Sequence, residues 1–199
     1  MLVIGLTGGI ASGKSTVSLL LKQKGAVIID ADKISRQVML PGKEAWFEIK
    51  KHFGDEILCP DGKINRKKLG SLVFSDKKKL KILNGITHPK IIDEIKNELL
   101  VYKRENQRVV VIDAALLLEV GLDSYVDEVW VVTVDEKTQI QRLMNREKNM
   151  TVRQAINRIR AQMPLEEKLK FAKRIIDNSS DIAHTKRQVE KIWEDLSIQ

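Results

Sequence analysis

The sequence contains one cysteine, Cys59, and lacks any long uninterrupted run of apolar residues. A single cysteine cannot form a disulfide bond within the chain, so we expect a reducing, cytoplasmic location. The longest apolar stretch, residues 109–120, is interrupted by Asp113 and Glu119, and it is shorter than the ~20 residues that a membrane-spanning helix needs. The apolar run 2–6 is too short for a signal peptide, and no basic region precedes it. We therefore expect no membrane partner.

The composition fits one folded domain with an anionic partner. A chain of 199 residues, of which 43% are hydrophobic, can bury a core, and its length suits one α/β domain with insertions. The formal net charge of +8 favours an anionic partner, but nucleic acid and nucleotides both qualify.

Short apolar runs alternate with helical segments along the chain. Their apolar character is continuous, which is typical of buried parallel strands. The predicted strands are residues 2–6, 26–30, 109–113, 128–134 and 174–177. The alternation predicts an α/β fold with a doubly wound, parallel, five-stranded sheet. Gly25 is expected to end the first helix, which begins at Lys14.

Two segments are too long to be simple connections between strands. Residues of about 33–105 are mostly helical and rich in lysine, and we interpret them as a substrate-side helical insertion. Residues of about 136–172 are predicted to form consecutive helices, punctuated by Asn149, Thr151 and Pro164, that act as a mobile lid. The core of the single domain (residues 1–199) would then comprise about 1–32, 106–135 and 173–199.

A phosphate-binding motif follows the first predicted strand. Residues 8–15, Gly-Gly-Ile-Ala-Ser-Gly-Lys-Ser, match G-x-x-x-x-G-K-[ST] at every fixed position and open a predicted helix. The glycines let backbone N–H groups turn toward phosphate oxygens, and the helix N-terminus adds positive potential. Lys14 is expected to reach the β- and γ-phosphates, and Ser15 to ligate Mg²⁺. The residues expected to bind ATP here are Gly8, Gly9, Ala11, Ser12, Gly13, Lys14, Ser15 and Thr16.

Several absences narrow the class of nucleotide-binding protein. No glycine has an aspartate three residues before it, and N-K-x-D does not occur, so the signatures of a GTPase switch are missing. An ATP-driven motor normally has a longer chain. These absences favour a small-molecule kinase. The three histidines, His52, His88 and His184, have no partners at metal-ligand spacing, so no metal is assigned to them.

Three acidic residues follow predicted strands, where an open parallel sheet places its ligands. Asp30 and Asp32 end the second strand. Asp32 could accept or orient the proton of an attacking hydroxyl, or it could only cap the next helix. Asp113 ends the third strand and could bind Mg²⁺ directly or through water, or it could be a strand-terminal turn residue.

Arginine is concentrated in one segment. The chain has 11 arginines and 24 lysines, yet residues 142–160 contain five arginines and only one lysine, Lys148. Guanidinium groups bind phosphate oxygens in a bidentate manner. Arg142 and Arg146 are four residues apart and should share one helix face, from which they could close over ATP. The alternative is a solvated helix whose arginines pair with residues such as Glu147.

The phosphate-binding motif of residues 8–15, the P-loop, occurs together with other short motifs. The first is Gly5-Leu6-Thr7-Gly8-Gly9-Ile10 running into Ser12-Gly13-Lys14-Ser15, followed by Asp30-Ala31-Asp32 with Arg36. The others are Phe53-Gly54, Asp61-Gly62, His88-Pro89, Gln139-x-x-Arg142, Arg158-x-x-x-Gln162 and Asp177-Asn178. In this combination the chain resembles the dephospho-CoA kinase family. It departs from the family at Ala115, where a proline is common, and at Ser179-Ser180, where a glycine is common.

The resemblance implies a reaction and its residues. The family transfers the γ-phosphate of ATP to the ribose 3′-hydroxyl of dephospho-CoA, the last step of coenzyme A synthesis. By resemblance Asp32 is the base, Arg142 is the lid arginine that contacts phosphate, and Asn178 lies near adenine. Arg146 is expected to bind ATP because of its helical spacing from Arg142. Arg36 and His88 are implied in substrate binding. ATP, dephospho-CoA and Mg²⁺ are the expected ligands, and no nucleic acid is expected. Without the resemblance, a nucleoside or nucleotide kinase is the alternative, followed by a nucleic-acid-stimulated ATPase.

Overall fold

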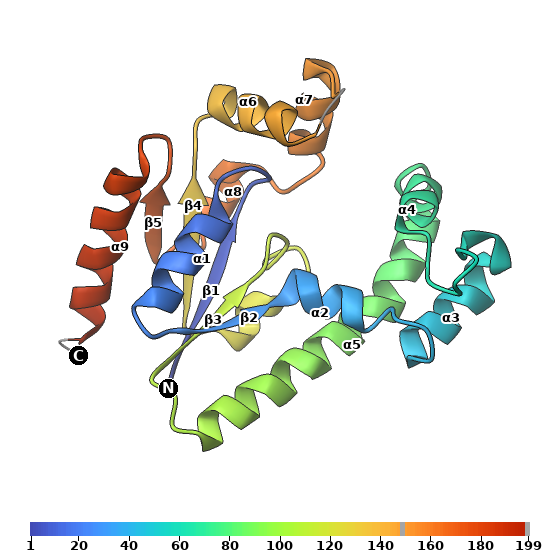
Figure 1. The fold of residues 1–199 in the computed structure, drawn as a ribbon, viewed down its shortest axis with the longest axis horizontal. Coiled ribbons are helices and arrows are strands. Elements are labelled where there is room, and N and C mark those ends of the chain that lie inside the picture. Colours follow the sequence, from blue (N-terminus) through green and yellow to red (C-terminus); the bar gives the residue numbers. More distant parts are fainter. Residues whose placement is uncertain (148–149, 198–199) are drawn as a thin grey trace. The chain divides into compact units, whose positions relative to one another are not determined.

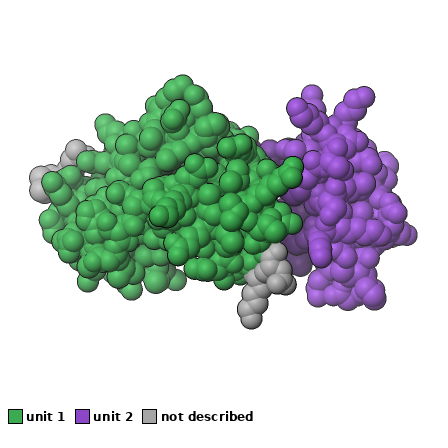
Figure 2. Space-filling model, turned by 90° about the horizontal axis from the view of Figure 1, so that it is seen from above, with its two compact units in different colours: residues 1–29, 102–199 green, residues 30–101 purple. Residues whose placement is uncertain are grey.

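The computed structural model describes residues 1–147 and 150–197. Lys148 and Asn149, which entered the sequence argument, lie outside the described residues. The chain forms two compact units, one of residues 1–29 and 102–199 and one of residues 30–101 (Figure 2). The second unit has nearly the range predicted for the helical insertion. No helix of the described chain is long and apolar enough to cross a membrane.

The first unit is organised by a parallel sheet (Figure 1). Its strands lie in the order β2-β3-β1-β4-β5, which confirms the predicted five-stranded sheet. The strands are β1 (Leu2–Gly8), β2 (Val27–Asp30), β3 (Val109–Asp113), β4 (Glu128–Thr133) and β5 (Arg174–Asp177). β1 is central, and it pairs in parallel with β3 on one side and with β4 on the other. The chain segments that follow β1, β3 and β4 therefore leave the sheet at the same edge.

Alternate strand residues supply the apolar core on one face of the sheet. Helix α1 (Lys14–Gln23) and helix α9 (Ile182–Ser197) contact each other on this face (Figure 1). The buried cluster contains Ile4, Leu6, Val17, Leu21, Val111, Trp130, Val132, Ile176 and Val189. As predicted, a glycine ends α1: Lys24 is the C-cap, and Gly25 follows it with φ +102°.

The other face of the sheet is covered by a loop and a short helix. A Cβ at Gly5 of β1 would lie 2.8 Å from Leu117 Cδ2, so the side chain of Leu117 packs directly on the strand. Helix α8 (Leu165–Leu169) contacts β4. The remaining helices of this unit are η2 (Leu122–Tyr125), α6 (Glu136–Arg146) and α7 (Val152–Arg160).

The second unit is helical and has a core of its own. It contains α2 (Ala31–Gln37), α3 (Glu44–Phe53), η1 (Asp55–Ile57), α4 (Arg66–Phe74) and most of α5 (Lys77–Arg104). Its buried cluster comprises Ala45, Ile49, Phe53, Ile57, Ile64, Leu69, Val73 and Ile86. The unit therefore buries apolar side chains among its own helices.

Candidate active site

The P-loop, residues 8–15, connects β1 to α1 through a tight turn. Ser12 N–H donates to the Gly9 carbonyl at 3.0 Å, and Ala11 lies at φ +60°. Gly13 precedes the first helical residue and has φ +85°. A Cβ at Gly13 would overlap the amide nitrogen of Asn178, so this position needs glycine for two independent reasons.

Asn178 supports the P-loop from beyond the end of β5. Its side-chain Nδ2 donates to the Ser12 carbonyl at 2.8 Å, and its Oδ1 accepts from Thr185 Oγ1 at 2.7 Å. Both bonds are buried, and Asn178 itself is buried. The Asn178 amide therefore fixes the P-loop backbone, a contact that the sequence argument did not anticipate.

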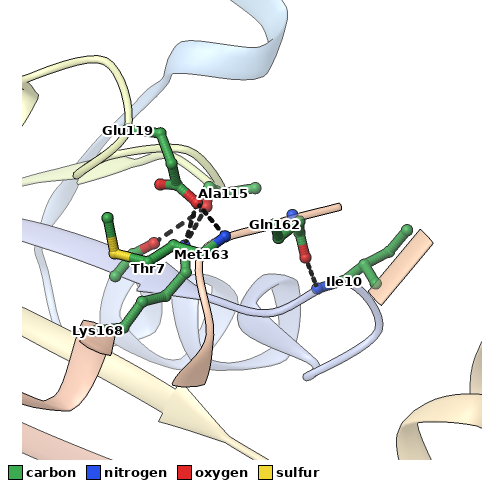
Figure 3. A network of polar contacts seen from close by, with 7 residues as sticks. All are labelled: Thr7, Ile10, Ala115, Glu119, Gln162, Met163 and Lys168. Carbon is green, nitrogen blue, oxygen red and sulfur yellow. Dashed lines mark hydrogen bonds and ion pairs between the residues drawn. The ribbon is translucent and has the colours of Figure 1, made fainter. Parts of the chain in front are cut away.

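Two glutamines hold the peptide groups of Ile10. Gln139 of α6 donates through Nε2 to the Ile10 carbonyl at 2.6 Å. Gln162, which follows α7, accepts from the Ile10 N–H at 2.6 Å (Figure 3). Sequence reasoning gave these glutamines no role, although their spacing from Arg142 and Arg158 belonged to the family motifs.

Lys14 and Asp113 form an ion pair beside the loop. The parallel register places Asp113, the last residue of β3, opposite Leu6 of β1. The two side chains are only 15% and 12% exposed, so solvent screens their attraction weakly. The structure therefore brings together the predicted phosphate-binding lysine and the candidate Mg²⁺ ligand.

Arg142 differs from the other arginines of its segment. Its Nη2 donates to the Asn178 carbonyl at 3.0 Å, whereas its buried Nη1 has no hydrogen-bond partner among the described residues. A buried donor without an acceptor is energetically costly, so such groups commonly mark ligand sites. The buried hydroxyl of Ser12 in the P-loop also lacks a hydrogen-bond partner among the described residues.

The rest of the arginine segment is more exposed. Arg146 and Arg158 both pair with Glu147, and their side chains are 59% and 50% exposed. For these two residues the structure favours the alternative of a solvated helix with Glu147 as partner. Arg142 and Arg146 are four residues apart on α6, but Arg142 bonds to the Asn178 carbonyl and Arg146 is exposed to solvent.

A cavity of about 300 Å³ lies beside the end of the P-loop. Arg142 and Asn178 line it together with the first turn of α1. The complete lining is Gly13, Thr16, Arg142, Asn178, Ser180 and Ile182. Four of the residues predicted to bind ATP therefore surround one cavity.

In the helical unit, Asp30 caps α2. Its Oδ1 accepts from the Lys33 N–H at 2.8 Å, and Asp32 lies inside the first turn of the helix. The alternative that Asp32 serves as the helix cap is therefore wrong. That Asp32 acts as the base stays a prediction.

Arg36 and Asp32 lie close enough to Arg66 in this unit to act electrostatically on its guanidinium group. The pKa of the Arg66 guanidinium is lowered by partial desolvation and by the charge of Arg36, while Asp32 opposes the shift. Two guanidinium groups so placed form a candidate anion site. Arg66 was missed because it is thirty residues from Arg36 in an unremarkable lysine-rich stretch. Burial lowers the pKa of His88, which favours its neutral form.

Comparison with known proteins identifies the family. A protein-family model for dephospho-CoA kinase matches residues 2–184. The chain belongs to the dephospho-CoA kinase family. This confirms the predicted family, its kinase activity in coenzyme A biosynthesis and its use of ATP.

Individual relatives of the kinase cover nearly its whole length. A dephospho-CoA kinase of Carboxydothermus hydrogenoformans is 47% identical over 98% of this chain and 97% of its own. A second, from Geobacter sulfurreducens, is 48% identical over 97% and 98%. A solved dephospho-CoA kinase from Campylobacter jejuni is 31% identical, covers 98% of this chain and 96% of its own, and has a TM-score of 0.73.

The contact between Gly13 and Asn178 can be tested with a matched glycine. Gly42 has φ +84° and no atom within 4 Å of an added Cβ, so Gly42→Ala introduces backbone strain without overlap. We expect Gly42→Ala to lower the free energy of unfolding by about 1–3 kcal/mol and to leave ATP affinity unchanged. Gly13→Ala should in addition weaken ATP binding more than about tenfold, because the loop must move away from Asn178. Urea unfolding and calorimetric titration with ATP measure both effects; equal ATP affinities in the two variants would contradict the assignment.

Proposed function

We propose that this kinase transfers the γ-phosphate of ATP to the 3′-hydroxyl of the ribose of dephospho-CoA, giving coenzyme A and ADP. Family membership supports the acceptor, and the geometry around the P-loop supports the donor. The observation that carries the proposal is the buried, unpartnered Arg142 Nη1 in the described chain, because that guanidinium lines the same cavity as Gly13 and Thr16.

ATP binding is proposed at the P-loop and the adjoining cavity. Backbone N–H groups of the loop and the N-terminus of α1 would hold the phosphates. An ammonium can donate three hydrogen bonds, so Lys14 can contact phosphate oxygens while it stays near Asp113. Arg142 would stabilise the charge that develops on the transferred phosphoryl group. Arg146 is proposed as an auxiliary contact, and Asn178 as the residue that shapes this end of the site.

The chemistry of the site fits a magnesium ion held mainly by ATP. No group of three or more His, Cys, Asp and Glu side chains that could hold a metal ion occurs among residues 1–147 and 150–197. Mg²⁺ in phosphate-binding sites usually has only one or two protein ligands together with phosphate oxygens and water. Ser15 and Asp113 would supply these ligands, Asp113 directly or through water. The ion would neutralise charge on the β- and γ-phosphates.

The acceptor is proposed to bind through residues of the helical unit. Asp32 would take the proton from the attacking hydroxyl or orient that hydroxyl, as positioned carboxylates do in phosphoryl transfer. Arg36 and Arg66 would contact the diphosphate of dephospho-CoA, because paired guanidinium groups suit phosphate oxygens. His88, whose neutral form is favoured, would contribute a neutral polar contact.

The acceptor is tested by measuring ADP formation with Mg-ATP and a panel of dephospho-CoA, adenosine, AMP, CMP and shikimate. We expect dephospho-CoA to be phosphorylated far faster than the other compounds. In the same assay, Arg66→Gln should raise the KM of dephospho-CoA and leave the KM of ATP unchanged. Turnover with AMP or CMP and none with dephospho-CoA would place the activity among nucleotide kinases. ATP hydrolysis only in the presence of nucleic acid would contradict the proposed class.

The role of Asp32 can be separated from that of its neighbour Asp30. Asp32→Asn keeps the size of the side chain but cannot accept a proton, so we expect kcat to fall by ~10²–10⁴ with little change in Tm. Asp30→Asn is the control, because asparagine caps helices as well as aspartate and the bond to Lys33 N–H can persist. Its kcat should stay near that of the unchanged enzyme. If Asp30→Asn is inactive and Asp32→Asn works normally, the base has been assigned to the wrong carboxylate.

Arg142 can be compared with Arg146 on the same helix. Positioned arginines contribute ~10³–10⁵ in turnover when they stabilise the transferring phosphoryl group. Arg142→Ala should therefore reduce kcat strongly, and Arg142→Lys should restore little, because the planar fork is lost. Arg146→Ala removes an exposed guanidinium paired with Glu147 and should have a much smaller effect. Equal losses of kcat in Arg142→Ala and Arg146→Ala would contradict a specific role of Arg142 and would indicate that the segment acts only as a basic surface.

A further inference from the structure

Lys168 of α8 is a buried cation with no place in the proposed reaction. Its side chain is 1% exposed, and its Nζ donates to the Ala115 carbonyl at 3.0 Å and to Glu119 Oε1 at 2.9 Å (Figure 3). Burying an ammonium is costly, and a well-packed apolar pair of similar size often stabilises a protein equally well. Stability alone therefore gives no reason for this ion pair.

The ion pair joins three segments of the first unit. The Ala115 carbonyl also accepts from Thr7 Oγ1 at 3.2 Å, and Thr7 immediately precedes the P-loop. Glu119 Oε1 also accepts from the Met163 N–H at 3.2 Å. Lys168 thus connects the end of β1, the segment after β3 and the connection between α7 and α8 (Figure 3).

The residue beside Met163 contacts the P-loop. Gln162 accepts from the Ile10 N–H at 2.6 Å, so anchoring Met163 also restrains the residue that holds Ile10. The same connection borders a cavity of about 210 Å³, which Gly9, Ser12, Gln162, Met163 and Lys168 help to line. Because open volume flanks Gln162, close packing alone does not fix it, and the bond from Met163 N–H to Glu119 restrains the neighbouring residue.

We propose that Lys168 is a positioning residue for ATP binding: it orders Glu119, which anchors Met163 and keeps Gln162 on the Ile10 N–H. In this role Lys168 acts through Glu119 and not through contact with a substrate. The inference rests on ATP binding at the P-loop, as in the proposed function, but not on the identity of the acceptor. Its ligand class is the nucleoside triphosphate already assigned to that loop.

The link is tested by a double-mutant cycle on ATP affinity, measured by calorimetric titration without an acceptor. Gln162→Ala removes the acceptor for Ile10, and Lys168→Met leaves the Glu119 carboxylate without its buried partner. Each should weaken ATP binding about tenfold, the usual worth of one hydrogen bond. The double variant should bind ATP no more weakly than the weaker single variant, because both changes break the same link.

Two further variants separate positioning from general stability. Glu119→Gln retains an oxygen that accepts from Met163 and should keep ATP affinity within about twofold, whereas Glu119→Ala should match Gln162→Ala. Lys170→Met, at an exposed lysine paired with Glu167 in the same region, is the control and should bind ATP normally. Urea unfolding identifies any variant that fails to fold. If Lys168→Met does not fold, Gln162→Ala and the two Glu119 variants still test the connection from Glu119 through Met163 to Gln162.

The inference is overturned by multiplicative losses in the double variant, or by folded Lys168→Met protein with unchanged ATP affinity. Failure of the kinase to phosphorylate dephospho-CoA would instead contradict the proposed acceptor. The calorimetric result would keep its meaning in that case, since no acceptor is present.

Discussion

Neutral amide side chains hold the main chain of the P-loop from outside. Asn178 donates to the Ser12 carbonyl, Gln139 donates to the Ile10 carbonyl, and Gln162 accepts from the Ile10 N–H. An amide can bond to a backbone group without adding charge to the site that is proposed to bind the phosphates of ATP. The rest of the site depends on these contacts, because the glycine turn has little conformational preference of its own.

The net charge of +8 does not show which buried cations of the first unit have acidic partners. Lys14 and Lys168, whose side chains are 15% and 1% exposed, pair with Asp113 and Glu119. Arg142 instead retains a buried guanidinium nitrogen that no described residue satisfies. An unsatisfied guanidinium donor of this kind at the end of the loop favours an anion there, and the solvated lysines and arginines elsewhere add only a diffuse attraction.

The parts of the fold and the site that could be predicted from the sequence are those that a local residue pattern specifies. The continuous apolar runs gave the five parallel strands, and the P-loop motif gave its own position between a strand and a helix. The motif could not reveal Gln139, Gln162 or Asn178 as its supports, because these residues lie more than a hundred positions away along the chain. The helical spacing of Arg142 and Arg146 was correct, yet only Arg142 reaches the backbone of Asn178. Asp30 and Asp32 both had the chemistry of a helix cap, and only the actual first turn of α2 decides between them.

The hydrogen bond between Ser12 and Asn178 also has a consequence for biosynthesis. Its partners are 166 residues apart, so the P-loop leaves the ribosome long before Asn178 does. Domains generally begin folding from the N-terminus during synthesis, at about 5–20 residues per second. At that rate the loop is without its Asn178 support for roughly 8–30 seconds after it is translated. A nascent chain therefore completes the hydrogen bonds that hold the P-loop only when β5 and the start of α9 have emerged, and a chain that ends before Asn178 never completes them.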